Sequence, residues 1–409
     1  MMTDSEYKYL KEEKIYEMIE ACYRCGDCRT AVRPAVGRYK VCPVREAISA
    51  KWEPFFARGK IMLIKGLLNG DLTPSQRLAE IVYQCTICGS CQSICNQSYH
   101  PQLKHPLSQL MNHPQIWEAL RAELWERGFR IKRHNEILDY CEKSHNPYFE
   151  KHSDRTKWIP EGKKFPDSAE YILYTGCTEP YRYPDILKNM IKILDKAQLS
   201  YTILGENEWC CGSIALRTGN TKLAKQLADH NYEEIKKLGS KKIITHCAGC
   251  YRTLKIDYPN LIPNYDLEIF HITEIIDSLI KNNQIQFDKE YVKKVTYHDP
   301  CHLGRHAKLY DPPREIIKNI PGIEFVEMYR NRENAWCCGA GGGVKSGFPD
   351  LALKIAQTRI NDAIETEATE IVTACPFCIN NLKDAVNNLN NEKQIEILDI
   401  LELILKSIK

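Results

Sequence analysis

The sequence has 409 residues, of which 43% are hydrophobic and 27% are charged, close to the averages of globular proteins. This composition excludes a disordered, collagen-like or coiled-coil protein, and the length allows about three domains of roughly 150 residues. Lysine and arginine number 56 against 53 aspartates and glutamates, so the charge is too balanced to indicate a nucleic-acid-binding surface. No apolar stretch approaches the roughly 18 residues of a membrane-spanning helix, and the first residues lack an apolar signal core. We therefore expect a cytoplasmic protein with no membrane span of its own.

The nineteen cysteines are the main departure from average composition. Disulfides do not persist in a reducing cytoplasm, so cysteines in this number are expected to be metal ligands or redox groups. All but Cys141 fall into four spaced groups. Cys141 lies in a helical stretch, where we expect it to be a buried small apolar residue.

The first two groups of cysteines lie near the N-terminus and have the spacing of iron–sulfur ligands. Three thiolates at intervals of three residues let one tight loop hold three corners of a cubane cluster. Structural zinc, the alternative, prefers paired C-x2-C knuckles a dozen or more residues apart. The spacing therefore predicts two [4Fe–4S] clusters. The two quartets are Cys22, Cys25, Cys28 and Cys42, and Cys85, Cys88, Cys91 and Cys95.

These quartets resemble those of bacterial two-cluster ferredoxins, in which the fourth cysteine of each run binds the other cluster. The pattern departs from the ferredoxin one, because the first run is interrupted before Cys42 and Asn96 replaces the usual proline. The resemblance implies one cluster on Cys22, Cys25, Cys28 and Cys95, and another on Cys85, Cys88, Cys91 and Cys42. Residues 58–68 and 74–83, between the quartets, have the periodicity of amphipathic helices. The region resembles the iron–sulfur halves of succinate dehydrogenases and heterodisulfide reductases.

A helix predicted over residues 115–127 ends at Gly128, as a C-cap requires. Residues 145–168 follow without periodicity and contain three prolines, so we place the domain boundary there. The predicted organisation begins with a helical ferredoxin-like [4Fe–4S] domain over 1–144 and a linker over 145–168.

Residues 169–288 and 289–409 form an internal repeat. Each copy contains a cysteine after a β-rich run, then Trp-Cys-Cys-Gly, then a C-x2-C pair after another β-rich run. Apolar runs alternate with helical stretches such as 185–196, 221–238 and 351–364, a pattern typical of parallel strands joined by crossover helices. The sequence thus predicts an α/β fold in which two pseudo-symmetric Rossmann-like repeats follow the helical domain.

Each repeat contributes five cysteines, and two of the five come directly after a β-rich run. Because ligands gather beyond the carboxyl ends of parallel strands, we expect the cysteines to converge on one edge. Five soft ligands, two of them adjacent, exceed what one tetrahedral zinc can use, which favours an unusual cluster with a shared thiolate. The two sets are Cys177, Cys210, Cys211, Cys247 and Cys250, and Cys301, Cys337, Cys338, Cys375 and Cys378.

A doubled cysteine-rich CCG domain behind two ferredoxin-type quartets resembles the D subunits of heterodisulfide reductases, over essentially the whole chain. The resemblance implies that each complete set holds a noncubane [4Fe–4S] cluster, and that the two clusters together cleave the disulfide between coenzyme M and coenzyme B. All ten positions retain cysteine here, whereas electron-relay relatives often lose some of them. We therefore expect an oxidoreductase that acts on sulfur groups, one subunit of a complex, in an anaerobic or well-reduced cytoplasm.

An electron-transfer subunit is the alternative function. Doubled CCG proteins also resemble the iron–sulfur partners of lactate, glycolate and glycerol-3-phosphate oxidases, of electron-transfer-flavoprotein complexes and of benzoyl-CoA reductase assemblies. There they carry electrons between a flavoprotein and a quinone, a cytochrome or another acceptor. The chain has no flavin or nicotinamide fingerprint, so either function requires a partner. A flavoprotein or a membrane cytochrome b subunit is expected, and the latter would hold the chain at the cytoplasmic face of the membrane.

Several polar residues flank the cluster cysteines. His298 and His302 are candidate proton donors to the released thiolates, with ordinary loop histidines as the alternative. The glycine-rich stretch 339–346 lacks the glycine that a phosphate loop has before its lysine, so close backbone packing against the second cluster is the better interpretation. Four further residues are candidates for binding an anionic substrate, with charge compensation of the clusters as the alternative for the cations: His246, Arg217, Arg305 and Lys345.

Overall fold

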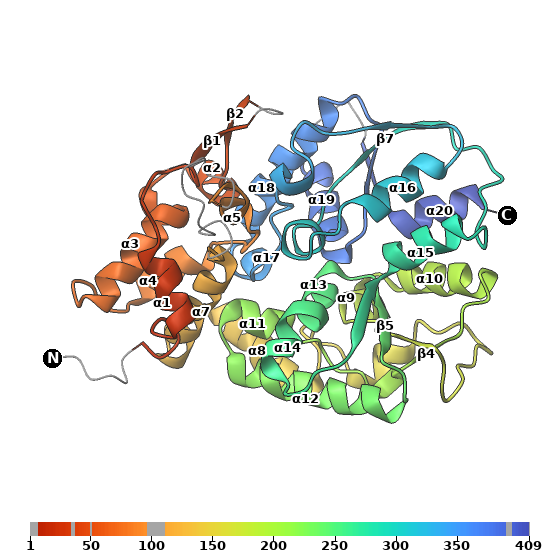
Figure 1. The fold of residues 1–409 in the computed structure, drawn as a ribbon, viewed down its shortest axis with the longest axis horizontal. Helices are drawn as coiled ribbons and strands as arrows, with labels where there is room; N and C mark the ends of the chain where they lie inside the picture. Colours follow the sequence, from red (N-terminus) through yellow and green to blue (C-terminus); the bar gives the residue numbers. More distant parts are fainter. Residues whose placement is uncertain (1–6, 34–36, 50, 96–110, 390–394, 409) are drawn as a thin grey trace.

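The computed structural model describes residues 7–33, 37–49, 51–95, 111–389 and 395–408. Figure 1 shows a helical N-terminal domain at one end and two α/β halves stacked beside it, the first in yellow and green and the second in cyan and blue. The predicted fold class, a helical domain followed by two pseudo-symmetric α/β repeats, is confirmed.

The N-terminal domain packs its amphipathic helices around a small apolar core that includes Ile61, Val82 and Leu120. The predicted helices between the quartets are α3 and α4, and α4 is capped by the hydroxyl of Ser75, which accepts a hydrogen bond from the backbone N–H of Leu78 at 3.2 Å. The helices are α1 (Glu13–Glu20), α2 (Pro43–Ala47), α3 (Ala57–Leu68), α4 (Gln76–Tyr83), α5 (Ser90–Cys95), α7 (His113–Glu126) and α8 (Lys132–Ser144). A hairpin of β1 (Thr30–Arg33) and β2 (Gly37–Lys40) precedes α2.

Each repeat contains a four-stranded parallel sheet. The strands are short and β-branched, and central residues such as Ile172, Ile243 and Val372 are fully buried, as in sheets covered on both faces. Equivalent strands follow the same spatial order. That order is β4 (Tyr201–Ile203), β3 (Tyr171–Leu173), β5 (Lys242–Thr245) and β6 (Glu268–His271) in the first repeat, and β8 (Ile323–Val326), β7 (Lys293–Tyr297), β9 (Glu370–Thr373) and β10 (Glu396–Asp399) in the second.

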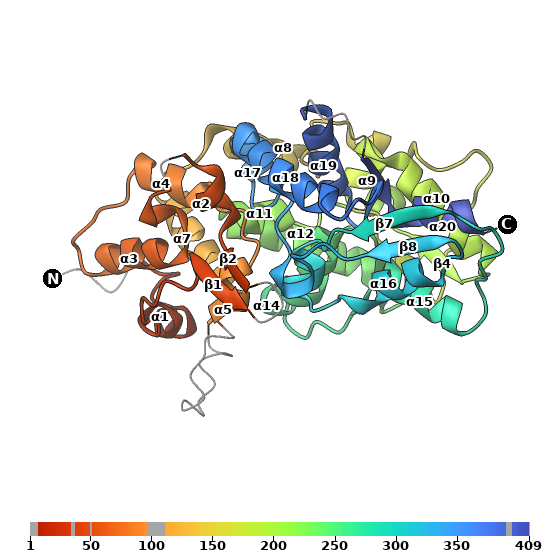
Figure 2. The same ribbon diagram turned by 90° about the horizontal axis from the view of Figure 1, so that it is seen from above.

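The last helix of each repeat also packs against a helix of the other repeat. The helix α15 (Ile272–Lys281) of the first repeat packs on α16 (Asp311–Asn319) of the second, and α20 (Ile400–Ser407) packs back on α10 (Pro184–Lys196). Apolar side chains of both repeats consequently form one continuous core. Figures 1 and 2 show these four helices together at the end of the molecule that lies away from the N-terminal domain.

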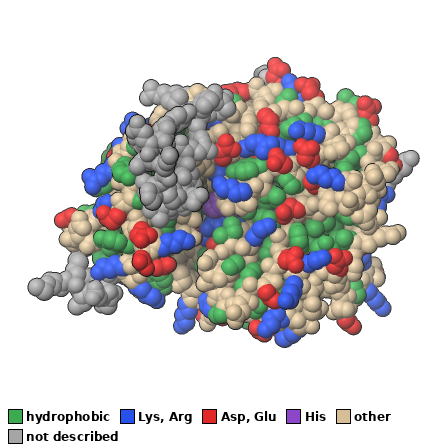
Figure 3. Space-filling view, in the orientation of Figure 1, with side chains coloured by type: hydrophobic (Ala, Val, Ile, Leu, Met, Phe, Trp, Pro, Cys, Tyr) green, Lys and Arg blue, Asp and Glu red, His purple; other side chains and the backbone are tan. Residues whose placement is uncertain are grey.

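The remaining helices connect strands or cover the sheets. They are α9 (Thr178–Arg182), α11 (Ser213–Thr218), α12 (Thr221–Lys237), α13 (Ala248–Arg252), α14 (Tyr258–Leu261), α17 (Val344–Gly347), α18 (Pro349–Ile364) and α19 (Pro376–Asn387). Short 3₁₀ turns occupy 53–55, 152–156, 205–207 and 332–334, and π-helical turns occupy 253–257 and 302–306. Within the described residues, no helix has both the length and the apolar character needed to cross a membrane. Acidic and basic side chains are interspersed over the described part of the face that Figure 3 shows.

Candidate active site

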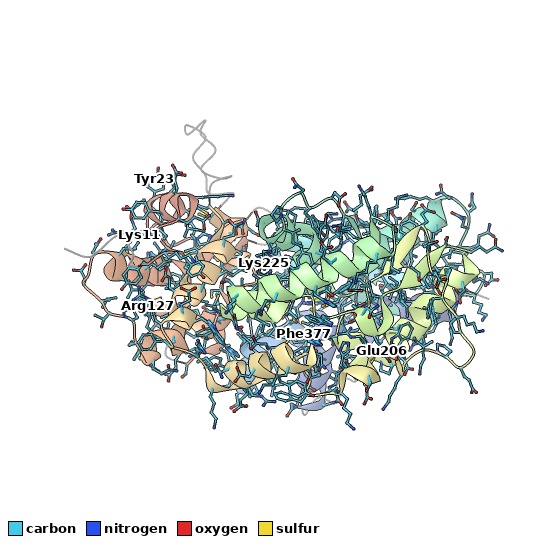
Figure 4. All side chains as sticks on the ribbon, turned by 90° about the horizontal axis from the view of Figure 1, so that it is seen from below. Lys11, Tyr23, Arg127, Glu206, Lys225 and Phe377 are labelled. Carbon is cyan, nitrogen blue, oxygen red and sulfur yellow. The ribbon has the colours of Figure 1, made fainter. Side chains whose placement is uncertain are left out.

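The cysteines of the two repeats converge on one cavity. Cys177 and Cys247 follow the carboxyl ends of β3 and β5, and Cys301 and Cys375 follow β7 and β9. These strands flank the point where the strand order of each sheet reverses, which is where open α/β sheets bind ligands. The cavity has a volume of about 510 Å³, and nine of the ten repeat cysteines line it, Cys337 being the exception. Its apolar wall includes Ile137, Pro147, Phe149, Ile214 and Phe377, the last of which is labelled in Figure 4.

The five thiols of each repeat form a chain of contacts, and equivalent cysteines follow one another in the same order in both repeats. In the first repeat the sulfurs of Cys211 and Cys250 lie 3.4 Å apart. Hydrogen-bonding contacts run from Cys177 through Cys210, Cys211 and Cys250 to Cys247, and from Cys301 through Cys337, Cys338 and Cys378 to Cys375. The two sets also touch each other, because the thiols of Cys247 and Cys375 are hydrogen-bonded across the repeat boundary.

A glycine fixes the turn after each adjacent cysteine pair. Gly212 and Gly339 have φ angles of 81° and 90°, a left-handed conformation that side chains rarely adopt. A Cβ at Gly339 would also collide with the backbone oxygen of Ala352. The Cys-Cys-Gly sequence therefore places two neighbouring thiols on one tight turn in both repeats.

The thiols of the N-terminal quartets divide into two neighbourhoods. Cys95, at the end of the second run, lies near Cys22 and Cys25 of the first. Cys42, at the end of the first run, lies near Cys85 and Cys88 of the second. Cys28 lies near Cys22 and Cys25 of its own run, and Cys91 lies near Cys85 and Cys88 of its own run. Cys42 also raises the pKa of Cys28, and Cys28 also raises that of Cys91. Cys25 is exposed and Cys88 is buried, so the two neighbourhoods lie at different depths.

The second quartet docks directly against the second repeat. The thiol of Cys88 shares a hydrogen bond with that of Cys337. Arg305 bridges the same contact: its Nε donates to the backbone oxygen of Cys88 at 2.7 Å, and its guanidinium also donates to the backbone oxygen of Ala335. The glycine-rich stretch 339–346 takes part as well, since a Cβ on Gly342 would collide with the backbone of Cys85 and Thr86. Close backbone packing is thus the role of this stretch in the fold, and its partner is the N-terminal domain.

Arg121 connects the N-terminal domain to both repeats by hydrogen bonds. Its guanidinium donates to the backbone oxygens of Arg217 at 2.6 Å and Gly342 at 2.7 Å, and to those of Val82 at 2.9 Å and Cys85 at 2.5 Å. The side chain is fully buried and stacks over the ring of Tyr83, 5.0 Å from its centroid. One planar cation therefore satisfies carbonyl groups from three parts of the chain.

The predicted proton donors occupy different environments. His302 lines the cavity. Burial and the neighbouring Arg252 and Arg217 lower its pKa well below the usual value, so its imidazole is neutral. His298 is fully buried and does not line the cavity, and its Nδ1 accepts a hydrogen bond from Nε of Arg359 at 3.1 Å.

Two of the four predicted substrate contacts, Arg217 and Lys345, line the cavity, and both are already paired. Arg217 forms ion pairs with Glu118 at 2.5 Å and with Asp257, and Lys345 forms one with Asp384. Arg305 lies outside the cavity lining and donates to the backbone oxygens of Cys88 and Ala335.

His246, the fourth predicted substrate contact, also lies outside the cavity lining. It is buried between Asp399, at 2.7 Å from its Nε2, and Glu179, at 3.3 Å from its Nδ1. Although burial opposes its charged form, the two carboxylates raise its pKa to about 10. The resulting ion pair joins the first repeat to the second, because Asp399 comes from β10.

Two residues contact cysteines of the first repeat although nothing in the sequence indicates these contacts. Arg155, in the segment predicted to be a linker, donates to the sulfur of Cys177 at 3.3 Å and is paired with the buried Glu208 at 2.9 Å. Cys141 is fully buried, as predicted, but its thiol is hydrogen-bonded to that of Cys210. Each repeat thus receives one additional thiol at the first cysteine of its adjacent pair, Cys141 in the first and Cys88 in the second.

The donor sets fit iron–sulfur clusters. Burial, followed by neighbouring thiols, raises the pKa of Cys28 to about 12, and burial raises that of Cys177 well above its usual value. So many buried thiols ionise together only when cations compensate their charge, as the iron ions of a cluster do. Five sulfur donors in each repeat exceed the four positions of a structural zinc.

Comparison with known proteins agrees with this arrangement. A 4Fe-4S dicluster domain matches residues 17–99, and a cysteine-rich CCG domain matches twice, at 171–255 and 295–383. The D subunit of a dihydromethanophenazine:CoB–CoM heterodisulfide reductase from Methanosarcina acetivorans is 37% identical over 95% of this chain and 94% of its own. An EtfAB:quinone oxidoreductase from Syntrophomonas wolfei is 32% identical over 81% of this chain and 47% of its own. A hypothetical protein from Helicobacter pylori has a similar fold, with a TM-score of 0.56 at 12% identity, covering 85% of this chain and 67% of its own.

Proposed function

The chain belongs to the family of heterodisulfide reductase D subunits, and from this membership we propose that it reduces a disulfide, of the kind formed by coenzyme M and coenzyme B, in the cavity between its two repeats. It is an iron–sulfur oxidoreductase of this type. One observation carries the proposal: nine of the ten cysteines in the two sets line one cavity, and the sets touch at Cys247 and Cys375. A disulfide bound there would lie within reach of both sets at once.

The proposed cofactors are two cubane and two noncubane [4Fe–4S] clusters. The neighbourhoods of the thiols favour crossed ligation of the cubanes. The cubanes would be held by Cys22, Cys25, Cys28 and Cys95, and by Cys85, Cys88, Cys91 and Cys42. The noncubane clusters would be held by Cys177, Cys210, Cys211, Cys247 and Cys250, and by Cys301, Cys337, Cys338, Cys375 and Cys378.

Cleavage of one disulfide consumes two electrons and two protons and yields two thiols. The bound clusters would supply the electrons one at a time. The apolar wall of the cavity would exclude water from the reacting sulfurs. Of the two predicted proton donors only His302 lines the cavity, and its neutral imidazole would have to take up a proton before it could give one to a released thiolate. The contact between Cys88 and Cys337 supports electron delivery from the second quartet to the second repeat.

A non-catalytic relay is the second candidate function, because the relatives include an EtfAB:quinone oxidoreductase. In either function the electrons come from a partner, which we propose is a flavoprotein or a membrane cytochrome b subunit. The protein would then act in the cytoplasm or at the cytoplasmic face of the membrane.

An anaerobic dye assay separates the two functions. The reconstituted holoprotein is reduced with a viologen dye, and dye oxidation is followed after addition of the coenzyme M–coenzyme B heterodisulfide. We expect rapid disulfide-dependent oxidation that is lost in Cys301→Ser. Clusters that exchange electrons with the dye but do not respond to the disulfide would refute the reductase function and favour the relay.

Double variants test the crossed ligation of the cubanes. If Cys42 and Cys91 serve the same cluster, Cys42→Ser combined with Cys91→Ser removes one cubane and leaves the other. The matched pair Cys42→Ser and Cys28→Ser should remove both. Counting cubanes by EPR and iron analysis distinguishes the cases, and the reverse pattern would establish uncrossed ligation.

A further inference from the structure

His298 is held in a single tautomer by a buried arginine. Its Nδ1 lies 3.1 Å from Nε of Arg359, and a guanidinium nitrogen can only donate, so Nδ1 is the acceptor. Arg359 is itself fully buried and fixed by the backbone oxygen of Arg330 at 2.7 Å and by Asp362 at 3.3 Å. The proton of the neutral imidazole must therefore be on Nε2.

The protonated Nε2 remains available to donate a hydrogen bond to a sulfur of the second repeat. Among the described residues, this atom is buried and has no nitrogen or oxygen partner. Ligand atoms of His298, Cys338 and Cys378 all lie within 4.8 Å of one another, so the two thiols lie beside the imidazole. A nitrogen that carries a proton has no lone pair for a metal, so His298 is suited to donate to a sulfur and not to bind iron.

We propose that His298 is a positioning residue that donates a hydrogen bond to Cys338 and thereby raises the reduction potential of the second repeat's cluster. The proposal rests on the cluster assignment under the proposed function. A hydrogen bond to a cluster sulfur stabilises the reduced state, which carries more negative charge.

The first repeat lacks this donor. Tyr174 stands at the equivalent position, three residues before Cys177 as His298 stands three residues before Cys301. Tyr174 also lies near Cys211 and Cys250, the counterparts of Cys338 and Cys378. Its hydroxyl, however, donates to the backbone oxygen of Trp209 at 2.7 Å. At the second cysteine of the adjacent pair the two sites thus differ in one hydrogen-bond donor, while the first repeat has a donor elsewhere, from Arg155 to Cys177 at 3.3 Å.

This difference would direct electrons within the molecule. The second repeat is the one whose Cys337 touches Cys88 of the second quartet. A higher potential at that cluster would make it the first acceptor in the repeats. The cluster of the first repeat would then be reduced second, by electrons that pass through the contact between Cys247 and Cys375.

The test is a redox titration of the holoprotein followed by EPR. We expect two noncubane midpoint potentials in the wild type, one of which falls in His298→Leu by at least a tenfold change in the reduction equilibrium, or about 59 mV for one electron, while the other stays unchanged. His298→Gln, which keeps an acceptor toward Arg359 and a donor toward Cys338, should restore most of the shift. Tyr174→Phe, the matched control, should leave both potentials unchanged.

Each outcome supports or overturns the tuning role of His298, and failure of that role can be distinguished from failure of the proposed function. Unchanged potentials in His298→Leu overturn the tuning role, and so does a loss of iron, which would indicate an iron ligand. Arg359→Met, which frees the imidazole without removing it, should also lower the potential that falls in His298→Leu, and no shift there would contradict the tautomer argument. Absence of any noncubane signal in the wild type, by contrast, would count against the cluster assignment itself.

Discussion

Replacing Cys247 with serine is expected to remove one noncubane cluster and to abolish disulfide reduction while both cubanes persist. Cys247 lies where the two thiol sets touch, so its loss breaks the first set and the contact to Cys375 together. Iron analysis should show a loss of about a quarter of the bound iron, because each of the four proposed clusters contains the same amount. EPR of the reduced protein should retain both cubane signals.

Cys141→Ala is the matched control for Cys247→Ser. Cys141 is equally buried and touches Cys210, yet it belongs to neither set of five. The control should retain all four clusters and turn over the disulfide. If Cys247→Ser kept its full iron content and its activity, the assignment of the first noncubane cluster would be wrong.

Replacing Arg121 with methionine is expected to destabilise the folded protein by at least about 3 kcal/mol, because four backbone carbonyl groups lose a buried charged donor. The lost contacts join the N-terminal domain to both repeats, so the variant should also transfer electrons between them more slowly. Anaerobic denaturant unfolding of the holoprotein measures the first effect, and stopped-flow reduction of the repeat clusters measures the second.

Arg77→Met serves as the control for Arg121→Met. Arg77 is largely exposed and forms only a surface ion pair with Glu80, so we expect a change of less than about 1 kcal/mol. Arg121→Lys should resemble the methionine variant, since an ammonium group lacks the planar fork that reaches several carbonyls at once. Unfolding of Arg121→Met at the wild-type denaturant concentration would contradict the proposed role of this side chain.

The fold could be predicted because its signals are local. Apolar runs with helical stretches between them indicate parallel strands, and the repeated spacing of the cysteines shows that one unit occurs twice. The packing of α15 and α20 against helices of the other repeat has no such signal. Amphipathic helices reveal which face they bury, but not against which partner.

The cysteines of the site could also be predicted, whereas the groups around them could not. His246 is adjacent to Cys247, but neighbouring residues of an extended chain point to opposite sides, so His246 faces Glu179 and Asp399 instead of the cavity. Arg305 follows Cys301 closely, yet the turn at 302–306 directs it toward Cys88. Arg121, Arg155 and Cys141 reach the site from distant parts of the chain, where only tertiary packing brings them close.

The most direct test of the account is a single-turnover count of released thiols. The holoprotein is reduced, freed of reductant and mixed anaerobically with the coenzyme M–coenzyme B heterodisulfide. We predict that two thiols appear for every disulfide consumed, that the clusters become oxidised at the same time, and that Cys247→Ser releases none. Clusters that remain reduced, with no thiol released by the wild type, would contradict disulfide cleavage in the cavity between the repeats.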